Sequence, residues 1–174
     1  MPHPPILITS LLLAALALTA CKPDSSSQSA ANGPEEWQAF RSDSGKWGFQ
    51  DNGKTVIEPG FDAVLPFRGD RARARDNGKF GFIDPRGEWV IEAKYDEAEH
   101  FLEDRALVRL ANKYGFIDRS GKPVIPLEYD YAESFEKGHA IVKKGEEIGY
   151  VSPSGEFKAG DHPNTKAEAA DGEN

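Results

Sequence analysis

Short apolar and polar runs alternate along residues 37–158, and the same order of runs returns at a fixed interval. Isoleucine, phenylalanine and alanine positions each recur 34 residues apart, and so do four glycines, Gly53, Gly87, Gly121 and Gly155. A fixed period of about 20 to 50 residues is the signature of a tandem repeat architecture. The spacing therefore predicts about three and a half copies of one structural unit.

One copy, residues 113–145, shows which elements the unit contains. Tyr114–Ile117 and Pro123–Ile125 are rich in aromatic and β-branched residues and flank the turn Asp118–Gly121, a pattern typical of a β-hairpin. In an earlier copy, Asn77-Gly78 joins a third strand to the next repeat, and Asn-Gly between β-rich runs is a strong hairpin signal. We predict an all-β fold of tandem antiparallel hairpins or meanders of about 34 residues, arranged as an open, elongated or solenoid-like array.

Between the second and third strands, each copy begins with an aromatic residue followed by Asp: Phe61-Asp62, Tyr95-Asp96 and Tyr129-Asp130. We expect the aromatic ring in the core, and we expect the Asp to close a local Asx-type turn by accepting a backbone N–H. The segment has room for one helical turn at most. A calcium ladder is disfavoured, because calcium takes about six to eight oxygens and each copy supplies one Asp.

The first and last copies are incomplete. Ala39 precedes Trp47 by eight residues, as Ala72 precedes Phe80, which predicts that residues 37–42 form the third strand of a leading partial copy. Partial copies at both ends are typical of a capped repeat array.

The best-preserved part of each copy resembles a known repeat. KWGF at 46–49, KFGFID at 79–84 and KYGFID at 113–118 are each followed by Gly, Val-Ile and an aromatic-Asp-x-x-x-x-Phe stretch. This pattern resembles the bacterial WG (KWG-type) repeat over nearly all of residues 37–157, with Phe80 and Tyr114 in place of the Trp that Trp47 retains. The resemblance implies a β-rich tandem-repeat fold and supplies no catalytic residues.

The N-terminal residues 1–20 contain no Lys, Arg, Asp or Glu, and their apolar run of 15 residues is shorter than the roughly 20 that a membrane-spanning helix needs. The run ends in Leu-Thr-Ala-Cys at Cys21, which resembles the lipobox of bacterial lipoproteins. The resemblance implies a cleaved lipoprotein signal peptide, an acylated Cys21 and a membrane anchor at the cell envelope. An ordinary signal peptide is the alternative. Lys22 is not the Asp that retains many lipoproteins in the inner membrane, which favours the outer membrane in a Gram-negative source.

Composition defines the two flanking segments. Residues 21–36 hold the lipidated Cys and a Ser-, Ala- and Gly-rich stretch that is expected to be a flexible tether, and residues 159–174 are expected to be a disordered acidic tail. The net charge is −8, which disfavours nucleic-acid binding.

The chain carries no nucleophile elbow, phosphate-binding loop or dinucleotide fingerprint. His100 and His139 occupy non-equivalent positions and have no second His or Cys at ligand spacing. We therefore expect a noncatalytic protein that uses no metal and no cofactor.

Two sets of residues are candidate binding surfaces. Side chains alternate across a strand, so cationic residues of the third strands share one face, whereas Ala72, Ala74 and their equivalents occupy the opposite, inward face. Stacking in register would align these cations as a contact surface for an envelope protein or polymer: Arg71, Arg73, Arg75, Arg105 and Arg109. A merely solvated strand face is the alternative.

The aromatic positions form the second set. We expect Trp47, Phe80 and Tyr114 to pack in the core, because each lies beside a recurring Gly in a predicted strand. The function that follows is an envelope-anchored, noncatalytic interaction or scaffolding module. The alternative is a carbohydrate- or peptidoglycan-binding module that uses the aromatic positions.

Overall fold

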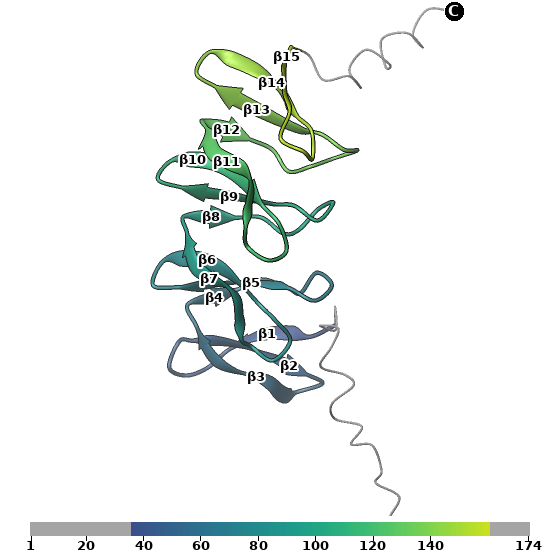
Figure 1. The fold of residues 1–174 in the computed structure, drawn as a ribbon. Helices are drawn as coiled ribbons and strands as arrows, with labels where there is room; N and C mark the ends of the chain where they lie inside the picture. The colour runs from purple at the N-terminus through teal and green to yellow at the C-terminus, as the bar shows by residue number, and fades with distance from the viewer. Residues whose placement is uncertain (1–35, 161–174) are drawn as a thin grey trace, which may run out of the picture.

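The computed structural model describes residues 36–160, and within this range the chain forms four antiparallel sheets that stack one after another (Figure 1). The first sheet contains β1 (Gln38–Arg41), β2 (Trp47–Asp51) and β3 (Lys54–Phe61). The second contains β4 (Ala63–Val64), β5 (Ala72–Asp76), β6 (Lys79–Ile83) and β7 (Trp89–Tyr95). The third contains β8 (Glu97–Ala98), β9 (Ala106–Leu110), β10 (Lys113–Ile117) and β11 (Pro123–Tyr129). The fourth contains β12 (Tyr131–Ala132), β13 (Ala140–Lys144), β14 (Glu147–Val151) and β15 (Phe157–Ala159). The predicted all-β, open tandem array is confirmed.

Each sheet joins parts of two consecutive copies. β5, the third strand of one copy, pairs with β6, the first strand of the next, through the two-residue turn Asn77-Gly78. Both turn residues have positive φ, 49° and 77°, as the hairpin turns that suit the twist of paired strands require. The expected antiparallel pairing between copies is therefore confirmed.

The glycine of the repeat motif permits a sharp bulge. Phe80 pairs with Tyr95 and Phe82 pairs with Ile91, so three residues of β7 lie opposite Gly81 alone. A Cβ on Gly81 would lie 2.3 Å from the carbonyl oxygen of Ile91. The strand β7 can cross β6 at this distance only because position 81 has no side chain.

Among the described residues, three hydrophobic cores lie between consecutive sheets. In each, aromatic residues of one sheet meet small residues on the first long strand of the next sheet. For example, Phe82 and Tyr95 of the second sheet share a core with Ala106 and Val108 of the third. The Ala-bearing face is buried as predicted, but the opposite face of an internal sheet is also covered, because another sheet lies against it.

Three local expectations need correction. The segments after the aromatic-Asp pairs form the two-residue strands β4, β8 and β12 instead of a helical turn. Ala39 pairs with Phe49, whereas Phe82, the equivalent of Phe49, pairs with Arg73; Ala39 therefore occupies the place of Arg73 and not that of Ala72. The register differs because the segment that connects the paired residues Ala39 and Phe49 is one residue longer than the segment that connects Arg73 and Phe82. At the other end, β15 continues to Ala159, one residue past the expected boundary.

Cys21, the expected signal peptide 1–20 and most of the expected tether and tail lie outside the described residues. Within residues 36–160, no helix has the length and apolar character needed to cross a membrane.

Candidate functional site

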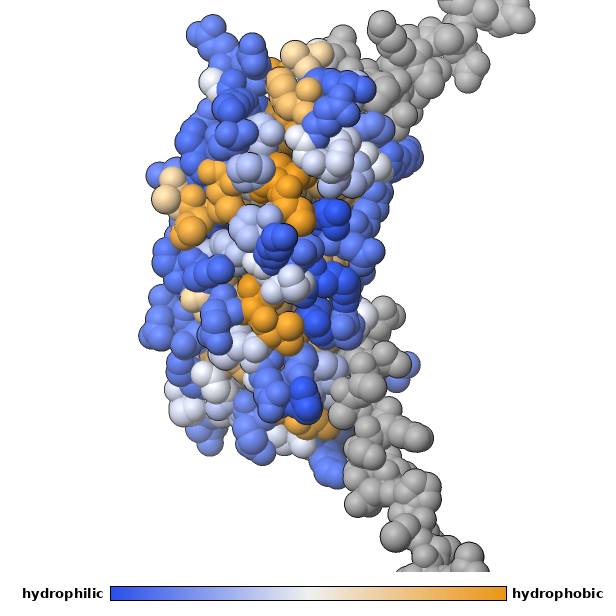
Figure 2. All heavy atoms as spheres, in the orientation of Figure 1, coloured by the Kyte–Doolittle hydropathy of each residue, from blue (hydrophilic) through white to orange (hydrophobic). Residues whose placement is uncertain are grey.

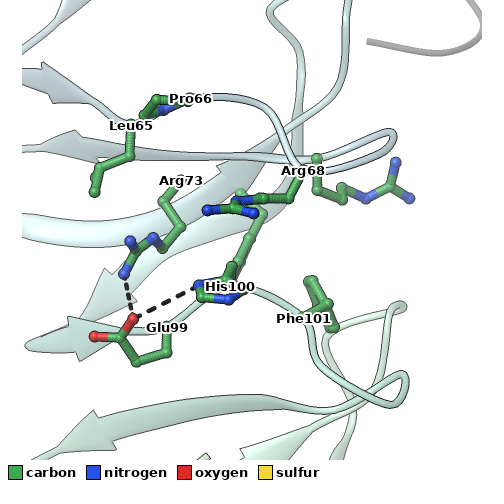
Figure 3. Close-up of a pocket in the computed structure, with 9 residues that line it drawn as sticks. Leu65, Pro66, Arg68, Arg73, Glu99, His100 and Phe101 are labelled. Atoms are coloured by element: carbon green, nitrogen blue, oxygen red, sulfur yellow. Dashed lines mark hydrogen bonds and ion pairs between the residues drawn. The ribbon is translucent and has the colours of Figure 1, made fainter. Parts of the chain in front are cut away.

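A cleft of about 180 Å³ opens between the second and third sheets (Figure 3). Its apolar walls include Leu65, Phe82 and Phe101, and its polar lining contains three arginines, one glutamate and one histidine. The polar residues are Arg68, Arg71, Arg73, Glu99 and His100.

Arg73 and Glu99 connect the two sheets across the cleft. The Nη1 of Arg73 donates to the carbonyl oxygen of Ala98 at 2.7 Å and to the carboxylate of Glu99 at 2.8 Å. The side chain of Arg73 is only 17 % exposed, whereas that of Glu99 is 49 % exposed. The guanidinium group thus lies largely inside the junction, and its carboxylate partner stays in contact with solvent.

His100 faces the same carboxylate in Figure 3, with its Nδ1 atom 3.9 Å from Glu99. Burial lowers the pKa of His100, and the positive charges of Arg73 and Arg68 lower it further. Since an unperturbed histidine has a pKa of about 6.5, the imidazole of His100 is mainly neutral at pH 7.

Asp70 forms an ion pair with one of the arginines that line the cleft. Its carboxylate accepts a hydrogen bond from Nη1 of Arg71 at 2.7 Å and forms an ion pair with Arg119 of the β10–β11 turn. The guanidinium of Arg119 also lies 5.2 Å from the ring centroid of Phe101, within the range of a cation–π contact. Asp70 therefore joins the second sheet to the third.

The five predicted arginines do not form one row of free charges. Arg71 and Arg73 meet at the cleft, whereas Arg75 lies 5.8 Å from the ring centroid of Phe80. Arg105 donates to the carbonyl oxygen of Pro153 at 3.4 Å, and Arg109 forms an ion pair with Glu97. Sheet stacking covers this face of the strands and provides intramolecular partners for most of the cations.

The aromatic residues of the motif, Trp47, Phe80 and Tyr114, are half-buried. The expectation that these rings lie inside the core is therefore wrong. The rings two residues further along, Phe49, Phe82 and Phe116, are fully buried, at 0 %, 1 % and 0 % exposure. Phe80 and Tyr114 pack against the cores from the side. They sit opposite Arg75 and Arg109, close to the hairpin turns where the sheets end.

Tyr114 borders a second cleft, of about 190 Å³, at the junction of the third and fourth sheets. Its hydroxyl lies 3.2 Å from the carboxylate of Glu97, and its ring centroid lies 6.4 Å from that of Tyr131, which is 47 % exposed. Burial, followed by the charge of Glu97, raises the pKa of the Tyr114 hydroxyl.

The recurring aspartates have a structural role that differs from the predicted local turn. Asp130 accepts the Gly145 N–H of the following hairpin turn at 2.8 Å and the ammonium of Lys113 at 2.5 Å. Asp96 bonds Ala111 N–H and Lys79 in the same way. The Lys hydrogen bond, together with the backbone hydrogen bonds, lowers the pKa of these carboxyls. Each Asp therefore connects two strands and a turn.

Sequence reasoning missed Arg68 and Glu99 and considered His100 only as a metal ligand. For Arg68 and His100 the usable signal was a departure from the repeat, because their equivalents 34 residues later are Leu102 and Ser134; Glu99 gave no such signal, because position 133 is also Glu. Among residues 36–160, no three His, Cys, Asp or Glu side chains are grouped so that they could hold a metal ion.

Each antiparallel sheet combines strands from two consecutive 34-residue copies, and the sheets stack one after another. This arrangement defines a tandem β-repeat protein. The family model of the WG containing repeat matches residues 47–80, 80–114 and 114–147, so the chain belongs to the WG repeat family. Comparison with curated proteins and with solved structures finds no match.

Proposed function

We propose that this protein is a noncatalytic binding or scaffolding module, held at the bacterial cell envelope by lipid on Cys21. The observation that carries the binding role is that, in the described part of the chain, clefts occur at two successive junctions between sheets. Side chains from two repeats meet at each cleft, so a stack of repeats offers several sites along one elongated body.

The surface supports a partner that contacts several repeats. On the face drawn in Figure 2, hydrophobic residues form separate patches along the stack, with hydrophilic residues between them. Exposed large apolar side chains occur in successive sheets, among them Val90, Leu110, Tyr131 and Ile148. An envelope protein or polymer that follows the stack could contact such patches and the clefts together, whereas the acidic charge disfavours nucleic acid.

The anchor is argued from the Leu-Thr-Ala-Cys sequence at Cys21. Two or more acyl chains hold a protein stably at a membrane, at about 0.8 kcal/mol per buried methylene. The repeat domain then needs no membrane-spanning segment of its own. Lys22 after the Cys favours the outer membrane over the inner membrane.

Metabolic labelling with a clickable fatty acid tests the anchor. Wild type should be labelled and should sediment with membranes, whereas Cys21→Ser should be unlabelled. Equal labelling of both proteins, or of neither, would contradict the anchor. Capture of envelope proteins and polymers by the labelled chain then tests the binding role.

A carbohydrate- or peptidoglycan-binding role is the second candidate, and the exposed ring of Tyr131 beside Tyr114 favours it. Retention on purified peptidoglycan that is lost in Tyr131→Ala, with an unchanged melting temperature, would support this candidate over the first.

A further inference from the structure

We infer that the cleft between the second and third sheets binds an organic carboxylate that carries a compact apolar group. The inference rests on the binding role proposed above and names the chemistry of one of its sites.

One turn and the strand that follows it supply three arginines to the lining of the cleft. Arg73 lies in β5, and Arg71, two residues earlier in the chain, immediately precedes this strand. Arg68 lies opposite Arg71 across a tight turn, where Arg68 N–H donates to Arg71 O at 2.9 Å. The turn and the strand together bring Arg68 to the cleft that Arg71 and Arg73 line.

These groups keep hydrogen-bonding capacity. A guanidinium has five N–H donors. Within residues 36–160, the only bonded guanidinium nitrogens of Arg71 and Arg73 are their Nη1 atoms, and the Arg68 side chain has no bonded partner. The Nε of Arg71 is buried without a partner, although Arg75, Arg105 and Arg109 share this last feature. Three arginines line the cleft, so the site does not depend on one unpaired atom.

The charge balance favours a monoanion. Two of the three arginines already have a carboxylate partner, Arg71 with Asp70 and Arg73 with Glu99, and His100 is mainly neutral at pH 7. The cleft keeps a positive charge that one carboxylate can offset, and guanidinium forks bind carboxylates in a bidentate way. A phosphate dianion would meet the repulsion of Glu99 at close range.

The walls favour an apolar group on that carboxylate. Leu65, Pro66, Phe82 and Phe101 surround the cationic groups. The volume of about 180 Å³ is well above the roughly 30 Å³ that one water occupies in the liquid. Ligand sites of this kind combine an apolar lining with a few polar groups that fix orientation.

The next junction provides a natural comparison. The equivalents of Arg68 and Arg73 there are Leu102 and Leu107, and Leu107 is a buried core residue. The repeat therefore accepts leucine at this position, so Arg73→Leu introduces the residue that the next copy already has. The arginine pair is the feature that distinguishes the cleft.

Calorimetric titration of the full chain in detergent with benzoate tests the inference, with neutral benzamide as the matched probe. Benzoate should bind saturably and benzamide at least about tenfold more weakly, since charge-assisted hydrogen bonds are lost. Arg73→Leu and Arg68→Gln should each weaken benzoate binding by about tenfold or more. Lys54→Gln, an exposed charge far from the lining, controls for net charge.

A peptide ending in a free phenylalanine carboxylate, its amidated form and inorganic phosphate complete the experiment. Binding of the free peptide but not the amide would identify a chain terminus as a source of the carboxylate, and binding of benzoate alone would identify a small molecule. Absence of saturable benzoate binding, equal binding of benzamide, tighter binding of phosphate, or unchanged binding in both arginine variants would overturn the inference. Arg68→Gln changes an exposed residue, so the test does not depend on how Arg73→Leu folds. The titration requires no lipid on Cys21, so its failure is distinct from failure of the anchor.

Discussion

Two equivalent junctions of the stack use the same backbone for different purposes. Between the second and third sheets, Arg73 occupies the inner strand position, Phe101 is only half-buried, and a cleft remains open. Between the third and fourth sheets, Leu107 occupies that position and Phe135 is 2 % exposed, so the space equivalent to the Arg68 end of the cleft is filled. The cleft of this junction lies instead between Leu107 and Tyr114. Arginine in place of leucine at this position therefore changes the lining of the junction without altering the register of the strands.

The difference teaches which parts of the repeat are fixed and which can vary. Bulge glycines and Lys–Asp pairs occur at both junctions, and they set the geometry of the sheets. The residues of the third strand that face the following sheet are not needed for that geometry, so they can vary between copies. Predictions can test this division.

The largest effect is expected at the bulge glycines, equally at both junctions. Gly81→Ala and Gly115→Ala would place a Cβ 2.3 Å and 2.7 Å from backbone oxygens, which cannot move without disrupting the strand pairing. We expect each substitution to lower the free energy of unfolding by about 3 kcal/mol or more, which is the upper end of the range typical of substitutions that overpack a site. Gly78→Ala has open space and a positive φ of 77°, so it should lower the free energy by only about 1 to 2 kcal/mol. Urea unfolding measures all three, and equal effects at positions 78 and 81 would refute the close-approach argument.

The inner strand position should behave differently at the two junctions. Leu107→Ala removes a side chain that is 8 % exposed, and we expect a loss of about 2 to 5 kcal/mol of unfolding free energy. Arg73→Leu replaces an ion pair whose carboxylate is half-exposed, so no buried charge is left behind, and the change should stay within about 1 kcal/mol. A large loss in Arg73→Leu would show that the arginine is needed for folding, and the two junctions would then be structurally alike.

The smallest effect concerns acid, and it should be shared by both junctions. The folded-state pKa of Asp96 and Asp130 lies below the unfolded value of about 3.9, because each carboxylate accepts hydrogen bonds from a Lys and a backbone amide. This stabilisation is present above the unfolded pKa and is lost as pH falls through the folded pKa. The melting temperature should therefore fall below about pH 4. The fall should be shallower in Asp96→Asn than in Asp43→Asn, a control whose side chain has no bonded partner among the described residues. Parallel profiles in the two variants would remove Asp96 from the explanation.

The sequence was sufficient for the strands, the hairpins and the pairing between copies, because glycine, isoleucine and alanine recur at one period and the turns carry Asn-Gly or Asp-x-x-Gly. Strand alternation also showed which residues share a face with Ala72. It could not show that the opposite face is covered, since this depends on the next sheet lying against it. The row of arginines therefore looked like a surface, whereas the structure places Arg73 largely inside a junction.

The register error at Ala39 has a similar cause. A single extra loop residue moves every side chain of a strand to the other face. The cleft itself required residues from two copies that differ from their equivalents, Arg68 and Arg73 from one and His100 from the next. A search for positions that depart from the repeat consensus would have found these three, but not their convergence.

Amide NMR spectra of the isotopically labelled full chain, recorded during titration with benzoate, test the central claim most directly. The claim is that the cleft lined by Arg68 and Arg73 binds a carboxylate and that the equivalent position beside Leu107 does not. We predict saturable shifts at Arg73, Phe82 and His100, with no comparable shifts at the equivalents Leu107, Phe116 and Ser134. Shifts of similar size at both junctions, or shifts confined to the residues around Leu107, would contradict the account.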